Sequence, residues 1–355
     1  MPITMREVAQ RAGVSKATVS YVLNGREASM RIPEETRDRI LAAVRELGYH
    51  PNGLARSLAH KRTHTIAIVM QYPALFSGWS GFTNELMHGV TDAAIEQGFD
   101  VMLHTRNPEG RWAHREGGLV EAEVANLTDG RVDGALLLRD LEDPLTLALR
   151  QRCFPTVLMF THAADPDQWF LDCDNIAGAR MATEYLLSLG HTRIAHFAGT
   201  PFSGAGRERR EGYRQAMEGA GLEVRADWVV ELTHPDADFT PAAHLFEASP
   251  AERPTAVFAW SDDVAIQGMR MLRGKGLSVP RDVAMIGFDS TALCDHTDPP
   301  LTSVRQPVYD MAAQALTLLV QRINGETPDR MQIRTLPEIV VRRSCGAQPA
   351  APSVP

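Results

Sequence analysis

The chain has 355 residues, of which 44% are hydrophobic, and carries a net charge of −8 at pH 7. This length suggests two or three domains, and the hydrophobic content is enough for a sizeable core. The overall acidity argues against nucleic-acid binding by the chain as a whole. No run approaches the roughly 18 apolar residues of a membrane span, so we expect no membrane partner.

Charge is unevenly distributed along the chain. Residues 1–62 contain 11 Lys and Arg against 6 Asp and Glu, whereas the remaining residues contain 25 against 38. A small basic head on an acidic body is the asymmetry expected when one end alone contacts a polyanion. A charged domain that is merely solvated is the alternative that charge by itself leaves open.

The first 50 residues predict three short helices. Thr4 and Glu7 have the spacing of a capping box, in which each side chain binds the backbone amide of the other residue. The third helix begins at Pro33, where proline suits the first turn, and stops at Gly48. The first and third helices carry apolar faces at helical spacing: Met5, Val8, Ala9 and Ala12, and then Ile40, Leu41, Val44 and Leu47.

The first two of these helices have the pattern of a helix-turn-helix. Ala9 is small enough for close helix packing, Gly13 permits a tight turn, and Ser15 can cap a second helix to about Leu23. Val14, Val19, Val22 and Leu23 would pack the second helix on the first. The residues left facing outward can contact bases or phosphates in the major groove: Ser15, Lys16, Ala17, Ser20 and Tyr21. A purely structural helix-turn-helix is the alternative.

Beyond a polar connector at 51–63, short apolar runs alternate with helical segments. Continuous hydrophobicity in these runs predicts strands buried on both faces, and hence parallel sheets covered by helices. About a dozen strands exceed one comfortable sheet, so we predict two. The predicted strands include Thr65–Met70, Val101–His104, Ala135–Leu138, Thr156–Phe160, Ile194–Ala198, Ala256–Trp260 and Val283–Phe288, and the helices 82–97, 176–189, 207–220, 263–275 and 307–324.

Cysteine usage and the N-terminus predict a cytoplasmic protein. Cys153, Cys173, Cys294 and Cys345 are scattered and form no Cys-x-x-Cys pair, which argues against zinc sites and a disulfide scaffold. The segment Met1–Glu7 becomes charged at once and has no apolar secretory core. We therefore expect a reducing compartment, with no metal and no cofactor.

Ordered motifs along nearly the whole chain resemble the lactose/galactose repressor (LacI/GalR) family. In the head they are Val8-Ala9, Gly13-Val14-Ser15, Thr18-Val19-Ser20, Leu23-Asn24-Gly25, Gly48-Tyr49-His50-Pro51-Asn52 and Ala55-Arg56-Ser57-Leu58. In the body they include Leu189-Gly190-His191, Arg209-Arg210-Glu211-Gly212-Tyr213, Gly276-Leu277-Ser278-Val279-Pro280, Ile286-Gly287-Phe288-Asp289 and Pro300-Leu301-Thr302-Ser303-Val304.

The resemblance implies an all-α helix-turn-helix head and an α/β, periplasmic-binding-protein-like body of two Rossmann-like lobes. We expect the head at 1–50, a hinge and linker at 51–63, the effector-binding and dimerisation domain at 64–345, and a tail at 346–355. The predicted first lobe comprises about 64–163 and 292–324, and the second about 164–291 and 325–345. Residues 53–59 would fold as a hinge helix on operator DNA, since so short a helix is marginal in water.

DNA contacts are predicted from both the head and the hinge. Leu58 would be an apolar wedge in the minor groove, although without the resemblance a plain linker would be the simpler interpretation of this segment. Gly53 departs from many relatives and makes the hinge costlier to fold by up to ~1 kcal/mol. The full predicted set is Thr4, Ser15, Lys16, Ala17, Thr18, Ser20, Tyr21, Asn24, Asn52, Ala55, Arg56 and Leu58.

The resemblance also places an effector site between the lobes. Its carried-over residues are Gln71, Leu75, Phe76, Arg209, Phe239, Ser261, Asp262 and Asp289. Arg and Asp give charge-assisted hydrogen bonds to hydroxyls, and an aromatic ring covers the apolar face of a sugar. Asp262 has an alternative role as a helix cap, Asp289 as an acceptor for a loop backbone, and Phe239 as a core residue. Relatives often have Asn-Asp where Ser261-Asp262 stands, so the ligand's identity stays open.

Two rival functions have weaker support in the sequence. An α/β enzyme lacks support, because Gly199–Gly206 has neither Gly-Lys-Ser/Thr nor the Gly-x-Gly-x-x-Gly spacing, and no nucleophile elbow or metal-spaced cluster occurs. A transport-type binding protein shares the body fold but not the N-terminal head. We therefore predict a homodimeric transcriptional regulator, a repressor of palindromic operator DNA controlled by a sugar-like effector, with no catalytic residues. Whether the effector induces or co-represses is not encoded in these motifs.

Overall fold

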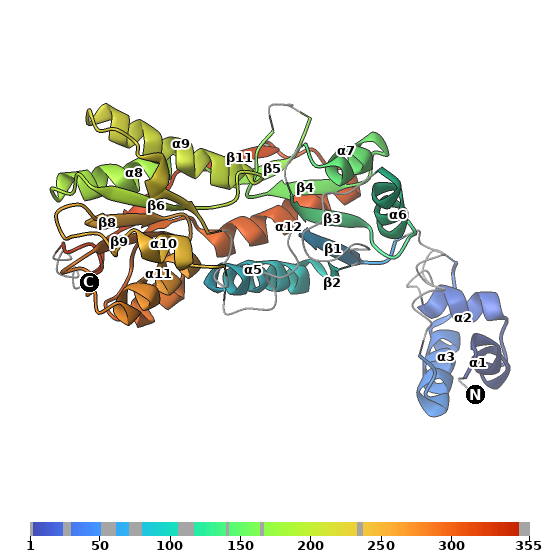
Figure 1. Ribbon diagram of the computed structural model, residues 1–355. Helices are drawn as coiled ribbons and strands as arrows, with labels where there is room; N and C mark the ends of the chain where they lie inside the picture. The colour runs from blue at the N-terminus through green and yellow to red at the C-terminus, as the bar shows by residue number, and fades with distance from the viewer. Residues whose placement is uncertain are drawn as a thin grey trace. The chain divides into compact units, whose positions relative to one another are not determined.

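The computed structural model describes residues 3–23, 30–50, 62–70, 80–105, 117–139, 142–163, 167–232 and 237–347 (Figure 1). The chain divides into two compact units, Met1–Thr63 and His64–Pro355. Among the described helices, none is long and apolar enough to cross a membrane.

The first unit is a three-helix head. It contains α1 (Met5–Ala12), α2 (Lys16–Leu23) and α3 (Glu34–Leu47), which closely match the predicted helices. Gly13 and Gly48 end α1 and α3 in the left-handed conformation, with φ of 65° and 61°, where a side chain would be strained. The three helices share one small core: Val8, Ala9, Ala12, Val19, Val22, Ile40, Ala43 and Tyr49.

The first lobe of the body is a parallel sheet with strand order β11-β5-β4-β3-β1-β2. Helices cover both of its faces, because successive strand residues point to opposite sides: Ile66 and Ile68 pack toward α5 and α12, Ala67 and Val69 toward α6 and α7. The strands are β1 (Thr65–Met70), β2 (Asp100–His104), β3 (Gly134–Leu138), β4 (Thr156–Met159), β5 (Phe170–Cys173) and β11 (Gln332–Thr335). The helices are α5 (Gly81–Gln97), α6 (Gly117–Leu127), α7 (Pro144–Gln151) and α12 (Val308–Asn324).

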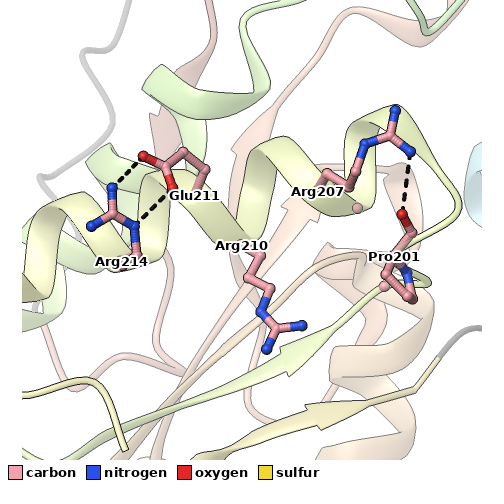
Figure 2. Close-up of a pocket in the computed structure, with 7 residues that line it drawn as sticks. Pro201, Arg207, Arg210, Glu211 and Arg214 are labelled. Carbon is pink, nitrogen blue, oxygen red and sulfur yellow. Dashed lines mark hydrogen bonds and ion pairs between the residues drawn. The ribbon is translucent and has the colours of Figure 1, made fainter. Parts of the chain in front are cut away.

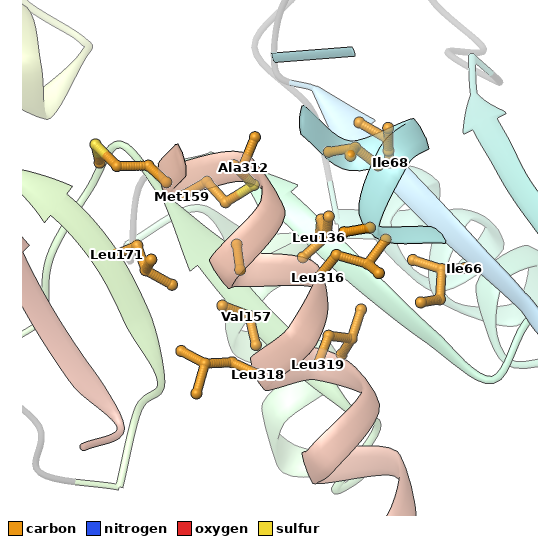
Figure 3. Packing of buried hydrophobic residues seen from close by; sticks show 14 of the residues in the cluster. Ile66, Ile68, Leu136, Val157, Met159, Leu171, Ala312, Leu316, Leu318 and Leu319 are labelled. Atoms are coloured by element: carbon orange, nitrogen blue, oxygen red, sulfur yellow. The ribbon is translucent and has the colours of Figure 1, made fainter. Parts of the chain in front are cut away.

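Helix α12 fills the middle of the first core. Figure 3 shows Leu316 and Leu319 of this helix beside strand residues such as Leu136 and Val157, all of them fully buried. Burial of a leucine side chain stabilises the fold by roughly 1.5–3 kcal/mol. The late segment that forms α12 therefore ties the C-terminal part of the chain to its early strands.

The second lobe is a sheet with strand order β12-β10-β9-β8-β6-β7, in which only the β10–β12 pair is antiparallel among the described strands. Its faces are covered in the same way, with Phe258 toward α8 and α9 and Val257 toward α10 and α11. The strands are β6 (Ile194–Ala198), β7 (Val229–Glu231), β8 (Ala256–Ala259), β9 (Ala284–Asp289), β10 (Thr302–Arg305) and β12 (Glu338–Val340). The helices are α8 (Asn175–Ser188), α9 (Gly204–Gly219), α10 (Thr240–His244) and α11 (Asp262–Gly274), with short 3-10 turns at Ala226–Trp228 and Ala292–His296.

The two predicted sheets are confirmed, but the lobe division differs in detail. Residues 164–291 and 325–345 were assigned to the second lobe, whereas β5 and β11 pair in the first sheet. Conversely, residues 292–324 were assigned to the first lobe, whereas β10 pairs with β9 in the second. These strands have only four residues each, so nothing local specifies their partners. The chain therefore passes between lobes after β5, after β10 and after β11.

Close packing of α8 on α9 depends on Gly212, since a Cβ there would lie 2.3 Å from the carbonyl oxygen of Ile176. We expect Gly212→Ala to destabilise the body by about 1–3 kcal/mol, the usual cost of overpacking. The matched control is Gly219→Ala on the same helix, where a Cβ would meet nothing within 4 Å. It should be neutral or stabilising by up to ~1 kcal/mol. Urea unfolding measures both, and equal effects would contradict the packing argument.

Candidate DNA-binding face and effector site

The start of α2 presents an exposed, polar face. Lys16 and Ala17 are exposed, while Val19 and Val22 on the same helix are buried in the head core. This is the arrangement expected of a recognition helix, which is held by its apolar side and reads DNA with the other. The predicted contact residues in the described part of this segment are all exposed or half-buried: Ser15, Lys16, Ala17, Thr18, Ser20 and Tyr21.

Two of the predicted DNA contacts also stabilise helix starts. The Ser15 hydroxyl accepts a hydrogen bond from the backbone N–H of Thr18 at 3.1 Å, which caps α2. At the start of α1, the Glu7 carboxylate accepts from the Thr4 N–H at 2.7 Å and from its hydroxyl at 2.8 Å. These bonds lower the pKa of Glu7. The predicted capping residues therefore orient both helices of the motif.

Eight predicted site residues lie outside the described residues. On the DNA side they are Asn24, Asn52, Ala55, Arg56 and Leu58, and on the effector side Gln71, Leu75 and Phe76.

Arg209 of α9 is a buried charged residue with partners from several elements of the second lobe. Its guanidinium is buried and donates from Nε to Asn175 Oδ1 at 2.9 Å and from Nη1 to the carbonyl oxygen of Trp260. It also stacks 3.6 Å above the centre of the Phe288 ring. Burial lowers the pKa of Arg209, and the nearby Asp289 opposes that shift. The side chain is thus held rigidly by α8, β9 and the end of β8.

Asp289 faces this guanidinium from the end of β9. Its Oδ1 lies 3.8 Å from Arg209 Nη1 and accepts from Gln306 Nε2 at 2.5 Å. Burial raises the pKa of Asp289 well above its ordinary value, although Arg209 lowers it. The residue has φ of 115°, a conformation in which non-glycine residues store strain. Strain and a buried ion pair at a strand's carboxyl end are typical of a binding site.

The contacts of Asp262 indicate a role in supporting the fold and not in binding a ligand. Its carboxylate accepts from the Ser303 hydroxyl at 2.5 Å, from the Thr291 N–H at 2.8 Å and from the Cys294 thiol at 3.0 Å. Burial outweighs these bonds and raises the pKa of Asp262 to about 6. All three donors belong to the loop between β9 and β10 and the start of β10. This side chain therefore fixes the loop that follows Asp289.

Of the alternative roles, the structure favours a core position for Phe239, whereas a helix cap at Asp262 is wrong. Ser261, rather than Asp262, is the N-cap of α11, because its hydroxyl accepts from the Val264 N–H at 3.3 Å. Phe239 is half-buried against the second-lobe core and lies edge-on to Phe197, with 6.2 Å between ring centroids. Of the described effector-site residues, the structure brings together Arg209 and Asp289 and gives the other three supporting contacts.

Sequence reasoning missed three residues that complete this site: Asn175, Trp260 and Gln306. Asn175 and Gln306 follow β5 and β10, the short strands that were not recognised. Trp260 was placed inside a predicted strand, whereas β8 ends one residue earlier. Their positions just after strands could have identified these three residues, because ligands bind beyond the carboxyl ends of parallel strands.

Within the described residues, one cluster of side chains is of the types that bind metal ions: His162, Asp172 and Glu208. Their potential ligand atoms lie within 4.8 Å of one another. The two ring nitrogens of His162 face different carboxylates: Nδ1 lies 2.8 Å from Asp172 Oδ2 and Nε2 lies 3.3 Å from Glu208 Oε1. The ring thus occupies the space between the acids, which is the geometry of a hydrogen-bonded imidazole and not of a metal centre.

A separate groove of about 250 Å³ runs along the outer side of α9 (Figure 2). Its arginines are already engaged: Arg207 donates to the Pro201 carbonyl, Arg214 pairs with Glu211, and Arg210 lies 3.8 Å from Glu231. Among the described residues, none of those predicted to bind the effector lines this groove. Two of its three arginines are therefore paired with carboxylates and the third is held by a carbonyl oxygen, and we assign the groove no ligand.

Comparisons with known proteins agree with both units. Residues 4–52 match the family described as bacterial regulatory proteins, lacI family, and residues 183–345 match a periplasmic binding protein-like domain. The HTH-type transcriptional regulator CelR of Thermobifida fusca is 36% identical over 348 residues, covering 96% of this chain and 98% of the relative.

Two solved structures extend the comparison. The lac repressor dimer bound to operator and the anti-inducer ONPF has a TM-score of 0.80 at 26% identity, covering 98% of this chain and 100% of that one. A CelR–cellobiose complex has a TM-score of 0.68 at 34% identity, covering 96% and 99%. These relatives are transcriptional regulators and not enzymes.

A helix-turn-helix head joined to a two-lobe α/β body defines a DNA-binding transcriptional regulator with a ligand-binding type of body. The chain belongs to the LacI family of bacterial regulatory proteins. The predicted fold class and family are thereby confirmed.

The role of Asp262 predicts a stability effect. We expect Asp262→Ala to destabilise the body by about 2–4 kcal/mol, because two buried donors and a thiol lose their acceptor. Asp310→Ala is the matched control, since Asp310 is an exposed acid in the first turn of α12, as Asp262 is a buried one in the first turn of α11. That control should change stability by less than about 1 kcal/mol. Equal losses in urea unfolding would refute the structural role.

Proposed function

We propose that this protein is a homodimeric repressor of palindromic operator DNA whose affinity is set by a small polyhydroxylated effector bound between the two lobes. The observation that carries the effector proposal is the buried Arg209–Asp289 pair. The relatives supply support by analogy, because one is complexed with cellobiose and another is a dimer on operator DNA. Since bacterial operators lie in the cytoplasm, we place the protein there.

The chemistry of the site favours a ligand with neighbouring hydroxyls. A carboxylate accepts hydrogen bonds and a guanidinium donates them, so the pair matches both functions of a sugar hydroxyl. Trp260 and Phe288 lie against the guanidinium, at 5.8 Å and 3.6 Å from ring centre to Cζ, and add apolar surface. Asn175 and Gln306 fix the two charged groups, so little reorganisation accompanies binding.

Control of DNA binding requires that the effector distinguish two lobe arrangements. An effector shifts the equilibrium only by the difference in its affinity for those arrangements. Gln306 and Asn175 follow two of the three passages of the chain between lobes, so a ligand held by their partners is well placed to sense the lobe arrangement. We further propose that the hinge at 53–59, with Leu58 as a minor-groove wedge, transmits the change.

The DNA-binding face yields a test. Lys16→Ala should weaken binding to operator and random DNA alike, because a phosphate contact carries no sequence information, and should reduce the salt dependence. Tyr21→Ala should instead change the preferred sequence, at a cost of about 1–3 kcal/mol on the operator. The operator is first selected from random duplexes, and fluorescence anisotropy then measures affinity at low and physiological salt. Lys275→Ala in the body is the control; a loss equal to that of Lys16→Ala would contradict the assignment.

The effector site yields a second test. Cellobiose and a panel of other sugars are screened by thermal shift, since a ligand at 100 times its Kd stabilises the folded state by about 2.7 kcal/mol. For any sugar that binds, Asp289→Asn should weaken affinity about 10- to 100-fold, because a hydrogen bond to a charged group is lost. Asp298→Asn, whose side chain is 90% exposed, serves as the matched control. An unchanged dose response in Asp289→Asn would exclude this carboxylate as a ligand contact.

A further inference from the structure

His162 lies at the contact between the two lobes. It belongs to the segment after β4 of the first lobe, and its Nδ1 contacts Asp172 Oδ2 on β5 of the same lobe at 2.8 Å. Its Nε2 lies 3.3 Å from Glu208 Oε1 on α9 of the second lobe. The Asp172 side chain is 2% exposed, that of Glu208 18% and that of His162 36%. One imidazole ring therefore joins acids from both lobes.

The surrounding groups fix both carboxylates as acceptors. Asp172 Oδ1 accepts from the Cys173 N–H at 2.8 Å, and Glu208 Oε2 accepts from Asn175 Nδ2 at 3.2 Å. Each remaining carboxylate oxygen faces one ring nitrogen. A neutral imidazole has one donor and one acceptor nitrogen, so it leaves one of these contacts as acceptor against acceptor. When both acids are ionised, only the imidazolium, with two donors, satisfies both of them.

We propose that protonated His162 is a latch between the lobes, in which the imidazolium joins Asp172 to Glu208 and its deprotonation releases the contact. The consequence for operator affinity rests on the proposed function, because it requires that lobe arrangement control DNA binding. The latch itself is a property of the body alone and does not require DNA or effector.

The charges around the ring set the direction of the pH dependence. The hydrogen bond with Asp172 and the charge of Glu208 raise the pKa of His162, while burial and Arg334 lower it. Arg334 of β11 lies 3.9 Å from Glu208 and 3.6 Å from Asp174. It therefore contacts these two carboxylates and not the imidazole ring. Separating the lobes removes Glu208 and lowers the pKa of His162. The latched arrangement is thus favoured below this raised pKa and lost as pH rises through it.

A second titration limits the latch on the acid side. Burial raises the pKa of Glu208, with His162 and Arg334 opposing the shift. Once Glu208 binds its own proton, the ion pair across the lobes disappears. The latch therefore operates in the pH window between the pKa of Glu208 and that of His162.

The first experiment measures the pKa of His162 in the full chain by NMR with ¹³C-labelled histidine, in buffer containing EDTA. We expect Glu208→Gln to lower that pKa, since it removes a charge contributed by the other lobe. The control is His88, which faces Asp92 within α5 at 3.3 Å and belongs to one lobe; its titration should be unchanged. An unaltered His162 titration in Glu208→Gln would overturn the latch.

The second experiment tests whether the contact is ionic. A double-mutant cycle of His162→Gln and Glu208→Gln in thermal unfolding should show coupling at a pH below the His162 pKa that the first experiment measures, and loss of coupling above it. Coupling of equal size at both pH values would show a neutral contact and reject the proposal. Coupling that EDTA abolishes would identify a metal ion between the lobes and reject it too. Operator affinity of the same variants is measured separately, so a failed latch is distinguishable from a failed repressor assignment.

Discussion

The buried guanidinium of Arg209 is the constraint around which the body is arranged. A charge withdrawn from water must be paired and hydrogen-bonded, or its burial costs several kcal/mol. Arg209 obtains its partners from Asn175, the carbonyl of Trp260, Asp289 and the face of Phe288. These groups come from segments distant in sequence, so the fold is required to complete the site. A change in the arrangement of these segments therefore also changes the geometry of the site.

The passages of the chain between lobes explain why polar residues gather at this place. Each passage leaves a strand at its carboxyl end, where polar side chains are buried beside one another. Asn175 follows the first passage, and Gln306 the second. The His162, Asp172 and Glu208 cluster lies at the same boundary and joins the lobes through charge. Polar contacts across a boundary depend on pairing and solvation, which a ligand or a proton can alter, whereas the apolar cores on either side remain packed.

Much of this protein follows from local sequence patterns. The three head helices, the capping Thr4 and Glu7 and the turn at Gly13 result from short-range hydrogen bonds and φ preferences, so a few adjacent residues specify them. The seven short apolar runs became strands, because continuous hydrophobicity such as that of Thr65–Met70 suits a strand covered by helices on both faces. Arg209 and Asp289 were predicted through resemblance, and the structure places them 3.8 Å apart.

The tertiary structure alone decided the remaining features. The sequence predicts no strand at β5 or β10, and both pair with strands distant in sequence, so only the tertiary structure shows where the lobe boundary lies. Asp262 and Asp289 are both acids at the ends of second-lobe strands, yet three donors from the β9–β10 loop and β10 surround one and a guanidinium faces the other. Sequence fixes which groups a residue carries, but hydrogen-bond partners from distant segments determine whether that residue supports the fold or is available to a ligand.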